Sequence, residues 1–374
     1  MAVRVLLAFG TRPEAIKLAP VVEALAADPR FAPTVAVTAQ HRGLLDQVLD
    51  LFGLVPDYDL DVMEPGQDLF HVTSAALLGL RDVLRDARPD LVVVQGDTTT
   101  TFVGALAAFY ERIPVAHVEA GLRTGDLDAP FPEEANRALT TRLSAFHFAP
   151  TEGARANLLR EGVPASAVHV TGNTGIDALL RIAARVRENP VLPLELDPER
   201  RLVLVTAHRR ESFDGGMERI ARAVAELATT RPDTDFVFPC HPNPNVRRPV
   251  NALLGTHPNV RVIEPVDYAE LVTLLTRAHL VLTDSGGIQE EAPSLNVPAL
   301  VLRDKTERPE GVEAGALRLV GTDPARIVAE AARLLDDPEA HATMARVPNP
   351  YGDGHASARI ASVLADSLIR EVAA

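Results

Sequence analysis

Short runs of apolar residues alternate with segments of helical periodicity along the whole chain. The apolar runs are continuous rather than alternating, which is typical of parallel strands covered on both faces. Helical periodicity at 13–27 and 68–87 predicts connecting helices. The pattern therefore predicts an α/β fold with doubly wound sheets. We expect strands at 3–9, 34–39, 91–96, 115–120, 146–150, 168–172, 201–207, 236–240, 260–265, 280–285, 298–303 and 318–321.

The alternation of strands and helices breaks near residues 172–200. A helical pattern at 172–188 is followed there by a proline-rich, acidic stretch that is typical of a linker. We therefore expect two Rossmann-like domains, at 1–170 and 171–355. A final helical pattern at 356–374 is long enough to cross back onto the first domain. Two such domains facing each other would leave a cleft lined by the carboxyl ends of strands, where ligands usually bind.

Composition restricts the class of partner. The 374 residues, 47% of them hydrophobic, suit two or three domains with sizeable cores. The net charge of -14, from 51 acidic and 37 basic residues, argues against a nucleic-acid or anionic membrane surface. A single cysteine, Cys240, excludes a disulfide framework and suits a reducing compartment. Because no apolar run approaches the ~18 residues of a membrane span, we expect a soluble cytoplasmic protein.

Basic residues follow two of the expected strands. The segment "AFGTRPEAIK" places Gly10, Arg12 and Lys17 where a strand gives way to a helix. A helix start with neighbouring bases favours an anion-binding site over a capped helix with two surface bases. The segment "TAHRRES" places His208 and Arg209 in a similar position, where they could stabilise a diphosphate. A solvated basic loop is the alternative for this second segment.

A third strand end is rich in small residues. In "TDSGGIQEE", Ser285, Gly286 and Gly287 predict a nest of backbone N–H groups at a helix start, and Glu291 follows about one turn later. An acid in that place could bind the hydroxyls of a ribose. The segment lacks the pattern of an ATP-hydrolysing P-loop. Asn173, in "TGNTGID", suits either a simple turn or a ligand contact.

Acidic residues follow two other strands. Asp97, taken alone, is explained as a helix-capping acid, whereas Glu119 ends an apolar strand and has no such explanation. Pro132 predicts a helix start, so Glu133 should lie in the first turn, where the helix dipole favours acids. Glu133 also lies four residues before Arg137, which is the spacing of a surface ion pair. No spacing of His, Cys and carboxylate residues suggests a zinc site.

Together these motifs resemble a known family. The segments "GTRPEAIK", "QGDTTT", "HVEAGLRTGD", "PEEANR", "TGNTGID", "HRRES", "TDSGGIQEEAPSL" and "RPEGVEAG" occur in the order found in non-hydrolysing UDP-N-acetylglucosamine (UDP-GlcNAc) 2-epimerases. The resemblance spans nearly the whole chain. It implies the GT-B architecture of two Rossmann-like domains, the second of which binds UDP. It also implies a homodimer that interconverts UDP-GlcNAc and UDP-N-acetylmannosamine (UDP-ManNAc) and needs neither nicotinamide nor metal.

The resemblance also assigns roles to residues. The expected catalytic residues are Asp97, Glu119, Glu133 and His208. The expected substrate-binding residues are Arg12, Lys17, Asn173, Arg209, Ser285, Gly286, Gly287, Glu291 and Arg308, with Val266 and Leu271 bordering the uracil. In this family UDP leaves C1 while a base removes the C2 proton, and UDP adds back after reprotonation on the other face. Which carboxylate acts as base and which as acid stays open at this point.

Some members of the family are activated by UDP-GlcNAc at a second site. The matching candidates here are Gln40, His41 and Arg42. Gly43 and Gly66 stand where regulated relatives carry longer polar side chains, which argues against such activation.

Other functions remain open on the sequence alone. A hydrolysing relative would release ManNAc and UDP, and other relatives act on UDP sugars that carry a 3-acetamido or uronate group. A GT-B glycosyltransferase would need an acceptor and would leave three carboxylates unexplained. A nucleotide-sugar sensor without activity would not need the intact set of acids.

Overall fold

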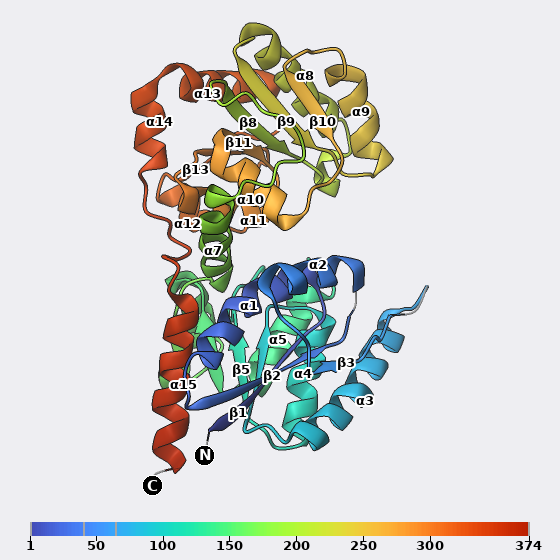
Figure 1. Cartoon of the computed structure of the whole chain (residues 1–374), viewed down its shortest axis with the longest axis vertical. Helices are drawn as coiled ribbons and strands as arrows, with labels where there is room; N and C mark the ends of the chain where they lie inside the picture. Colours follow the sequence, from blue (N-terminus) through green and yellow to red (C-terminus); the bar gives the residue numbers. More distant parts are fainter. Residues whose placement is uncertain (1, 40–41, 64–65, 373–374) are drawn as a thin grey trace. The chain divides into compact units, whose positions relative to one another are not determined.

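The computed structural model describes residues 2–39, 42–63 and 66–372 (Figure 1). The chain divides into two compact units, residues 1–178 with 352–374 and residues 179–351. Each unit is a parallel sheet with helices around it, as the sequence predicted. Within the described ranges, none of the helices combines the length and apolar character that a bilayer span requires.

The sheet of the first unit has the strand order β3-β2-β1-β4-β5-β6-β7. Its strands are β1 (Val3–Phe9), β2 (Phe31–Val37), β3 (Tyr58–Asp59), β4 (Leu91–Gln95), β5 (Val115–Val118), β6 (Phe146–Ala149) and β7 (Val168–Val170). The six strands expected in this half are confirmed. The sequence missed β3, whose two residues are too few to show a period, although they extend the register of β2.

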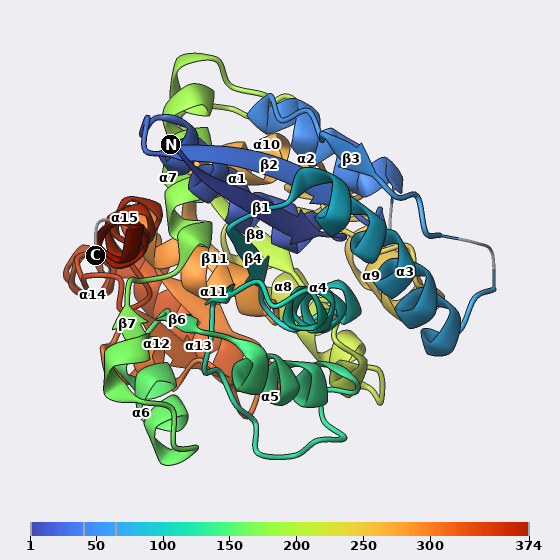
Figure 2. The same cartoon turned by 90° about the horizontal axis from the view of Figure 1, so that it is seen from below.

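Helices cover the first sheet on both sides. They are α1 (Arg12–Ala26), α2 (Arg42–Phe52), α3 (Leu69–Ala87), α4 (Thr99–Tyr110), α5 (Glu133–Leu143), α6 (Glu152–Arg160), the short η1 (Ala165–Ala167) and α15 (Ala356–Val372). A further helix, α7 (Thr174–Glu188), begins in the first unit and ends in the second. α1 packs against α2 and α15, while α4 packs against α3 and α5 (Figure 2). Apolar side chains of β1 and β4 are fully buried between these layers, which explains their continuous apolar sequence.

The sheet of the second unit has the strand order β10-β9-β8-β11-β12-β13. Its strands are β8 (Arg201–Thr206), β9 (Thr234–Pro239), β10 (Val260–Ile263), β11 (Ala278–Thr283), β12 (Ala299–Val301) and β13 (Leu317–Leu319). Its helices are η2 (Arg210–Ser212), α8 (Gly216–Thr230), α9 (Pro244–Leu254), α10 (Tyr268–Arg277), α11 (Gly286–Glu291), η3 (Ala292–Leu295), α12 (Pro309–Glu313), α13 (Pro324–Asp336) and α14 (Pro338–Ala345). The six strands expected here are also confirmed, and the main core lies between the sheet and α8, α9 and α13.

Strand order reverses once in each sheet. In the first unit the chain moves outward from β1 in one direction and from β4 in the other, so the loops after these two strands diverge. The loops after β8 and β11 diverge in the same way in the second unit. Such switch points are where open α/β sheets bind their ligands. The loops that carry Gly10, Asp97, His208 and Ser285 therefore lie at the switch points of the two sheets.

The C-terminal helix returns to the first unit, as predicted. α15 packs against α1 (Figure 1). Its start is capped by the carboxylate of Asp177, which accepts hydrogen bonds from the backbone N–H groups of Ala356 at 3.1 Å and Ser357 at 2.6 Å. These bonds satisfy two of the N–H groups that a helix start leaves open.

Candidate active site

Two acids of the first unit are joined by one arginine. Asp97 follows β4 and Glu119 follows β5, and these strands are neighbours, so both side chains start at the same edge of the sheet. Arg137 of α5 donates through Nη1 to the backbone oxygen of Glu119 at 2.7 Å and through Nη2 to the carboxylate of Asp97. Arg137 is buried. A guanidinium with two directed bonds therefore holds both strand ends in register.

Glu119 is the most constrained of the acids. It is buried, and its backbone adopts a φ of 63°, which is uncommon for a residue other than glycine. Its Oε2 forms an ion pair with the ammonium of Lys17 and accepts a hydrogen bond from the amide of Gln95. Its Oε1 lies 3.8 Å from the guanidinium of Arg137. Strained backbone together with a buried, paired charge is characteristic of functional sites.

Glu133 lies in the first turn of α5, as expected. Its Oε2 is buried, and no hydrogen-bond partner for it occurs among the described residues. The predicted surface pair of Glu133 with Arg137 is wrong, because Arg137 points inward to Asp97 and Glu119. Its neighbour Glu134 accepts bonds from the backbone N–H groups of Thr124 and Gly125, and so shapes the loop before α5.

A buried glutamate that the sequence analysis did not single out holds the neighbouring loops. The carboxylate of Glu14 accepts bonds from the N–H groups of Gly10 and Thr11 and from the hydroxyls of Thr11, Thr98 and Thr101. It thus ties the loop after β1 to the loop after β4. The signal was present in the sequence, since Thr11 and Glu14 form the T-x-x-E capping box.

The remaining expected residues of the first unit lie close to these loops. Arg12 is the first residue of α1 and is partly buried. Asn173 is buried and accepts a bond from the N–H of Gly175 at 2.9 Å, at the start of α7. A side chain at Gly175 would contact both Asn173 and Lys17. The start of α7 therefore packs against the lysine that pairs with Glu119.

In the second unit, one buried acid organises the loop after β8. Asp284 follows β11 and has no exposed surface. Its Oδ2 accepts bonds from the backbone N–H groups of His208 at 2.7 Å and Arg209 at 2.8 Å, while its Oδ1 lies 3.5 Å from Nδ1 of His208. The imidazole of His208 stacks on that of His241, with ring centroids 5.8 Å apart.

The other expected residues of the second unit lie around α10 and α11. Gly286 is buried against Arg308, and a Cβ at Gly286 would come within 2.8 Å of the guanidinium carbon. Arg308 donates through Nε to Glu290 at 2.8 Å. Glu291 accepts a bond from the hydroxyl of Tyr268 at 3.2 Å, which brings the end of α11 to the start of α10. Further members of the expected set are found in the same elements, namely Val266 before α10, Leu271 on α10, and Ser285 and Gly287 at the start of α11.

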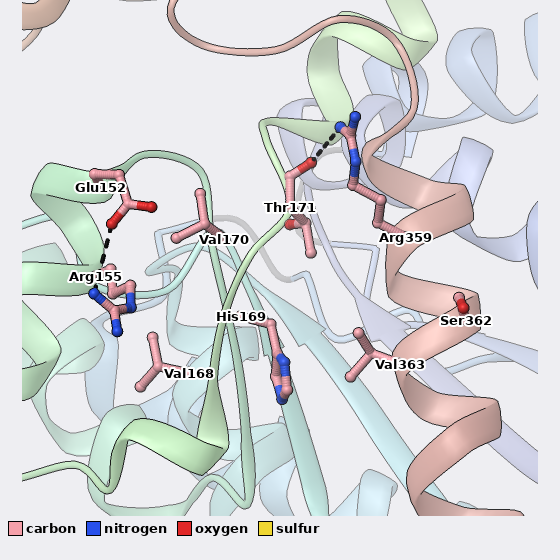
Figure 3. A pocket seen from close by; sticks show the side chains of 9 residues that line it. All are labelled: Glu152, Arg155, Val168, His169, Val170, Thr171, Arg359, Ser362 and Val363. Carbon is pink, nitrogen blue, oxygen red and sulfur yellow. Dashed lines mark hydrogen bonds and ion pairs between the residues drawn. The ribbon is translucent and has the colours of Figure 1, made fainter.

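Two cavities differ in their relation to these residues. A cavity of about 510 Å³ in the second unit is lined by His208, Arg209, Glu211, Phe213, His241 and Asn243. A cavity of about 650 Å³ in the first unit lies between β7, α6 and α15, where it is lined by His169, Thr171 and Arg359 among others (Figure 3). The cavity in Figure 3 contains none of the residues expected in the site. The cavity beside His208 is therefore the one that matches the sequence analysis.

Comparison with known proteins gives the family. The family model of UDP-N-acetylglucosamine 2-epimerase matches residues 23–365. The chain is 57% identical over 373 residues to the UDP-N-acetylglucosamine 2-epimerase of Escherichia coli K12, covering 98% of this chain and 99% of that protein. The chain belongs to the UDP-N-acetylglucosamine 2-epimerase family. The resemblance noted in the sequence is thereby confirmed.

Solved structures of this epimerase family agree with the fold. The crystal structure of the UDP-GlcNAc 2-epimerase from Neisseria meningitidis bound to UDP-GlcNAc matches with a TM-score of 0.89 and 49% identity, over 97% of this chain and 100% of that chain. The enzyme from Methanocaldococcus jannaschii, in complex with UDP-GlcNAc and UDP, matches with a TM-score of 0.79 and 35% identity, over 97% and 100% of the two chains.

Two of the three candidates for a second, activating site of the epimerase family fall outside the residues that the structure describes. Gln40 and His41 fall outside the described residues, and Arg42 is described only as the first residue of α2. Gly43 is exposed, and a Cβ added there would meet nothing within 4 Å.

Proposed function

We propose that the protein interconverts UDP-GlcNAc and UDP-ManNAc by inverting the configuration at C2 of the sugar. The observation that carries the proposal is the pair of strand-end acids, Asp97 and Glu119, joined by the buried guanidinium of Arg137 in a chain of this family. A glycosyltransferase has no evident use for such a cluster of acids, whereas a proton-transfer reaction requires it.

The proposed reaction proceeds by elimination and re-addition. No carbonyl group acidifies the hydrogen at C2, so direct removal of that proton is difficult. A base takes the C2 proton while the C1–O bond breaks and its electron pair leaves with UDP, which forms a C1=C2 double bond. A proton then reaches C2 from the opposite face, and a phosphate oxygen of UDP adds back to C1. Atoms and electrons balance without an oxidant or reductant.

Removing a proton from one face of the sugar and adding one to the other requires carboxyl groups in different environments. Glu119 touches the cations of Lys17 and Arg137, whereas the buried Oε2 of Glu133 lacks a hydrogen bond among the described residues. Asp97 is partly exposed and also touches Arg137. Acidic groups whose surroundings differ in this way can take separate roles as acid and base. We propose that these three carboxylates supply both roles.

Departure of UDP requires positive charge and hydrogen-bond donors near the phosphates. We propose that His208, Arg209 and the backbone at Ser285–Gly287 provide them, and that Arg12 also binds the substrate. The Nε of Arg209 is buried and lacks a partner among the described residues, so it is available as a donor. Preformed donors of this kind stabilise charge that develops in a transition state. Arg308, Asn173 and Glu291 complete the proposed substrate contacts, with Val266 and Leu271 beside the uracil.

One experiment tests the proposal against its alternatives. Purified protein is incubated with UDP-GlcNAc in D₂O without an acceptor, and proton NMR follows the sugar. We expect UDP-ManNAc with deuterium at C2. Free ManNAc and UDP as main products would instead establish a hydrolysing enzyme, in which water captures the intermediate. No reaction would contradict the proposed substrate, and a UDP sugar with a 3-acetamido or uronate group would then be tested.

The same assay examines activation. A progress curve that starts from UDP-ManNAc is recorded with and without a trace of UDP-GlcNAc. Gly43 and Gly66 lead us to expect curves without a lag. A long lag that the trace abolishes would show that UDP-GlcNAc activates the enzyme.

We also propose that the protein is a homodimer, as the family resemblance implies. Large apolar side chains are exposed on three adjacent helices, with Phe70 and Leu78 on α3, Phe109 and Tyr110 on α4 and Leu139 on α5. Exposed apolar surface of this kind is typical of an interface. Sedimentation equilibrium should give the mass of two chains, and Phe70→Glu with Leu78→Glu should shift it to one. A wild-type monomer at micromolar concentration would contradict the proposal.

A further inference from the structure

Asp284 is a buried acid to which the proposed reaction assigns no role. Its carboxylate is fully buried at the switch point of the second sheet, between the loop after β8 and the start of α11. The Oδ2 atom is satisfied, because it accepts two backbone hydrogen bonds from the β8 loop. These bonds explain how Asp284 holds the loop, but they occupy only one of its two oxygens.

The second oxygen is unusual. Oδ1 of Asp284 is buried and has no hydrogen-bond partner among the described residues. Leaving a buried acceptor without a donor is costly, and most such groups in folded proteins have partners. The imidazole of His208 lies beside this oxygen, with its Nδ1 3.5 Å away. A small rotation of that ring would bring an Nδ1–H within hydrogen-bond distance of Oδ1.

The imidazole of His241, which stacks on that of His208, faces a hydrogen-bond donor rather than an acceptor at its Nδ1. Nδ1 of His241 accepts a hydrogen bond from the backbone N–H of Asn243 at 3.1 Å. An accepting Nδ1 carries no proton, so neutral His241 holds its proton on Nε2. The two stacked imidazoles therefore differ in what faces Nδ1: a carboxylate oxygen for His208 and a backbone donor for His241.

Burial of His208 favours the neutral ring over the imidazolium in the free protein. Partial burial lowers the pKa of His208, and Arg209 and His241 lower it further, while Asp284 raises it. Burial likewise raises the pKa of the Asp284 carboxyl, against the effect of its two backbone donors and of His208. A diphosphate bound near His208 would add negative charge and favour the imidazolium.

We propose that Asp284 is a positioning residue that directs His208 through the hydrogen on Nδ1, leaving Nε2 to face the substrate. The inference rests on the proposed function only in naming the substrate as a nucleoside diphosphate sugar. Asp284 itself does not touch the reacting atoms. It selects one tautomer of neutral His208 and stabilises the imidazolium once the diphosphate is bound, as the carboxylate partner of a catalytic histidine does in other enzymes.

The direct test is NMR of the intact protein with ¹⁵N-labelled histidine. The ring signals of His208 are assigned by comparison with His208→Gln, and His241 in the same spectrum serves as the internal reference. We expect neutral His208 to carry its proton on Nδ1 and His241 on Nε2. In Asp284→Asn the side-chain amide can face the ring as a donor, so His208 should change to the Nε2–H form. His208 with its proton on Nε2 in the wild type would overturn the inference.

Kinetics provide a second test through a double-mutant cycle. Asp284→Asn should lower kcat about 100-fold or more, with KM changed less than about threefold, because orientation rather than binding is lost. In a His208→Gln background the same change should have almost no further effect, since Asp284 acts through His208. An equal loss in both backgrounds would show a purely structural role for Asp284 and refute the inference.

A matched control separates loop stability from histidine positioning. Asp337 also accepts two backbone N–H bonds, from Glu339 and Ala340, but it lies at the start of α14 and outside the proposed site. Asp337→Asn should leave kcat and the His208 ring signals unchanged. The two proposals fail separately. A protein without epimerase activity can still show the Nδ1–H form of His208, and an active epimerase can show the Nε2–H form.

Discussion

Replacing Glu14 tests whether one buried carboxylate holds the two loops that carry Arg12 and Asp97. Glu14→Ala would leave the N–H groups of Gly10 and Thr11, which donate to Glu14 at 3.0 and 2.8 Å, without acceptors. Each unsatisfied buried donor costs about 1–3 kcal/mol. The hydroxyls of the neighbouring threonines can bond elsewhere, so they add little.

We therefore expect Glu14→Ala to lower the free energy of unfolding of the first unit by about 3–5 kcal/mol, once the lost packing of the side chain is included. Glu14→Gln keeps one oxygen for the two N–H groups, and the threonine hydroxyls can rotate to face the new amide. The cost of the glutamine variant should therefore be about 1–2 kcal/mol.

The pH dependence of the stability provides a second, independent test of the role of Glu14. Burial raises the pKa of the Glu14 carboxyl, and the hydrogen bonds that it accepts only partly offset this effect. The unfolded chain then releases this proton at lower pH than the folded chain does. The stability contributed by neutral Glu14 is fully present below the ordinary glutamate pKa of ~4.3 and is lost as pH rises through the folded pKa. The deficit of Glu14→Gln relative to wild type should therefore shrink as pH rises.

Two measurements check these expectations. Urea unfolding followed by circular dichroism gives the stability of the three proteins at several pH values, and hydrogen exchange by mass spectrometry reports on the peptide that contains Gly10 and Thr11. Exchange in that peptide isolates the first unit, because a chain of two units need not unfold in one step. An alanine variant within about 1 kcal/mol of wild type would refute the reasoning. So would a glutamine deficit that grows with pH.

Three further predictions concern the same unit. Asp97→Asn and Glu119→Gln should each lower epimerisation by about 10²–10⁴-fold, while calorimetry shows UDP binding within about threefold of wild type; normal turnover in both would remove these acids from the site. Gly10→Ala should cost about 1–3 kcal/mol in thermal unfolding, because its Cβ would lie 2.1 Å from a threonine hydroxyl, whereas Gly43→Ala, with nothing within 4 Å, should be neutral or slightly stabilising. Burial lowers the pKa of His117 from 6.5 to about 3. Below pH ~6.5 the unfolded chain therefore binds a proton at His117 that the folded chain does not bind. Wild type should therefore lose about 2 kcal/mol between pH 7.5 and pH 5 through this residue, and His117→Gln should show a correspondingly smaller loss in urea.

The strands could be predicted from sequence because their apolar runs are continuous, as buried parallel strands require. β3 could not be predicted in this way, because its two residues, Tyr58 and Asp59, form no apolar run and are a strand only through their pairing with β2. Glu119 was recognisable because an acid at the end of an apolar strand has few structural explanations, whereas Asp97, which a helix cap could explain, was assigned to the site only through the family resemblance. The family could be recognised because eight segments keep the same order over nearly the whole chain.

Individual partners were harder to predict. Local spacing suggested that Arg137 pairs with Glu133 on a helix surface, but the buried face of α5 turns Arg137 toward Asp97 and Glu119. No local pattern predicted that Lys17 pairs with Glu119. The contacts of Asp284 were not predicted, because the sequence pattern in this loop indicated only the serine and the glycines that follow it. Each of these contacts depends on which side of a helix or strand a residue faces. The spacing of residues along one element does not identify their partners on a neighbouring element.

The sequence by itself determined the class of fold, the family and the loops where chemistry should occur. These features depend on local patterns, namely apolar periodicity, turn residues and short motifs in order. Only the tertiary structure decided which charges meet. Lys17 and Glu119 lie 102 residues apart, and Asp97 and Arg137 lie 40 apart, yet parallel strands bring the strand ends and the helices that follow them to one edge of the sheet. A buried charge is costly without a partner, and which partner is available to Glu119 or Asp97 depends on packing rather than on order along the chain.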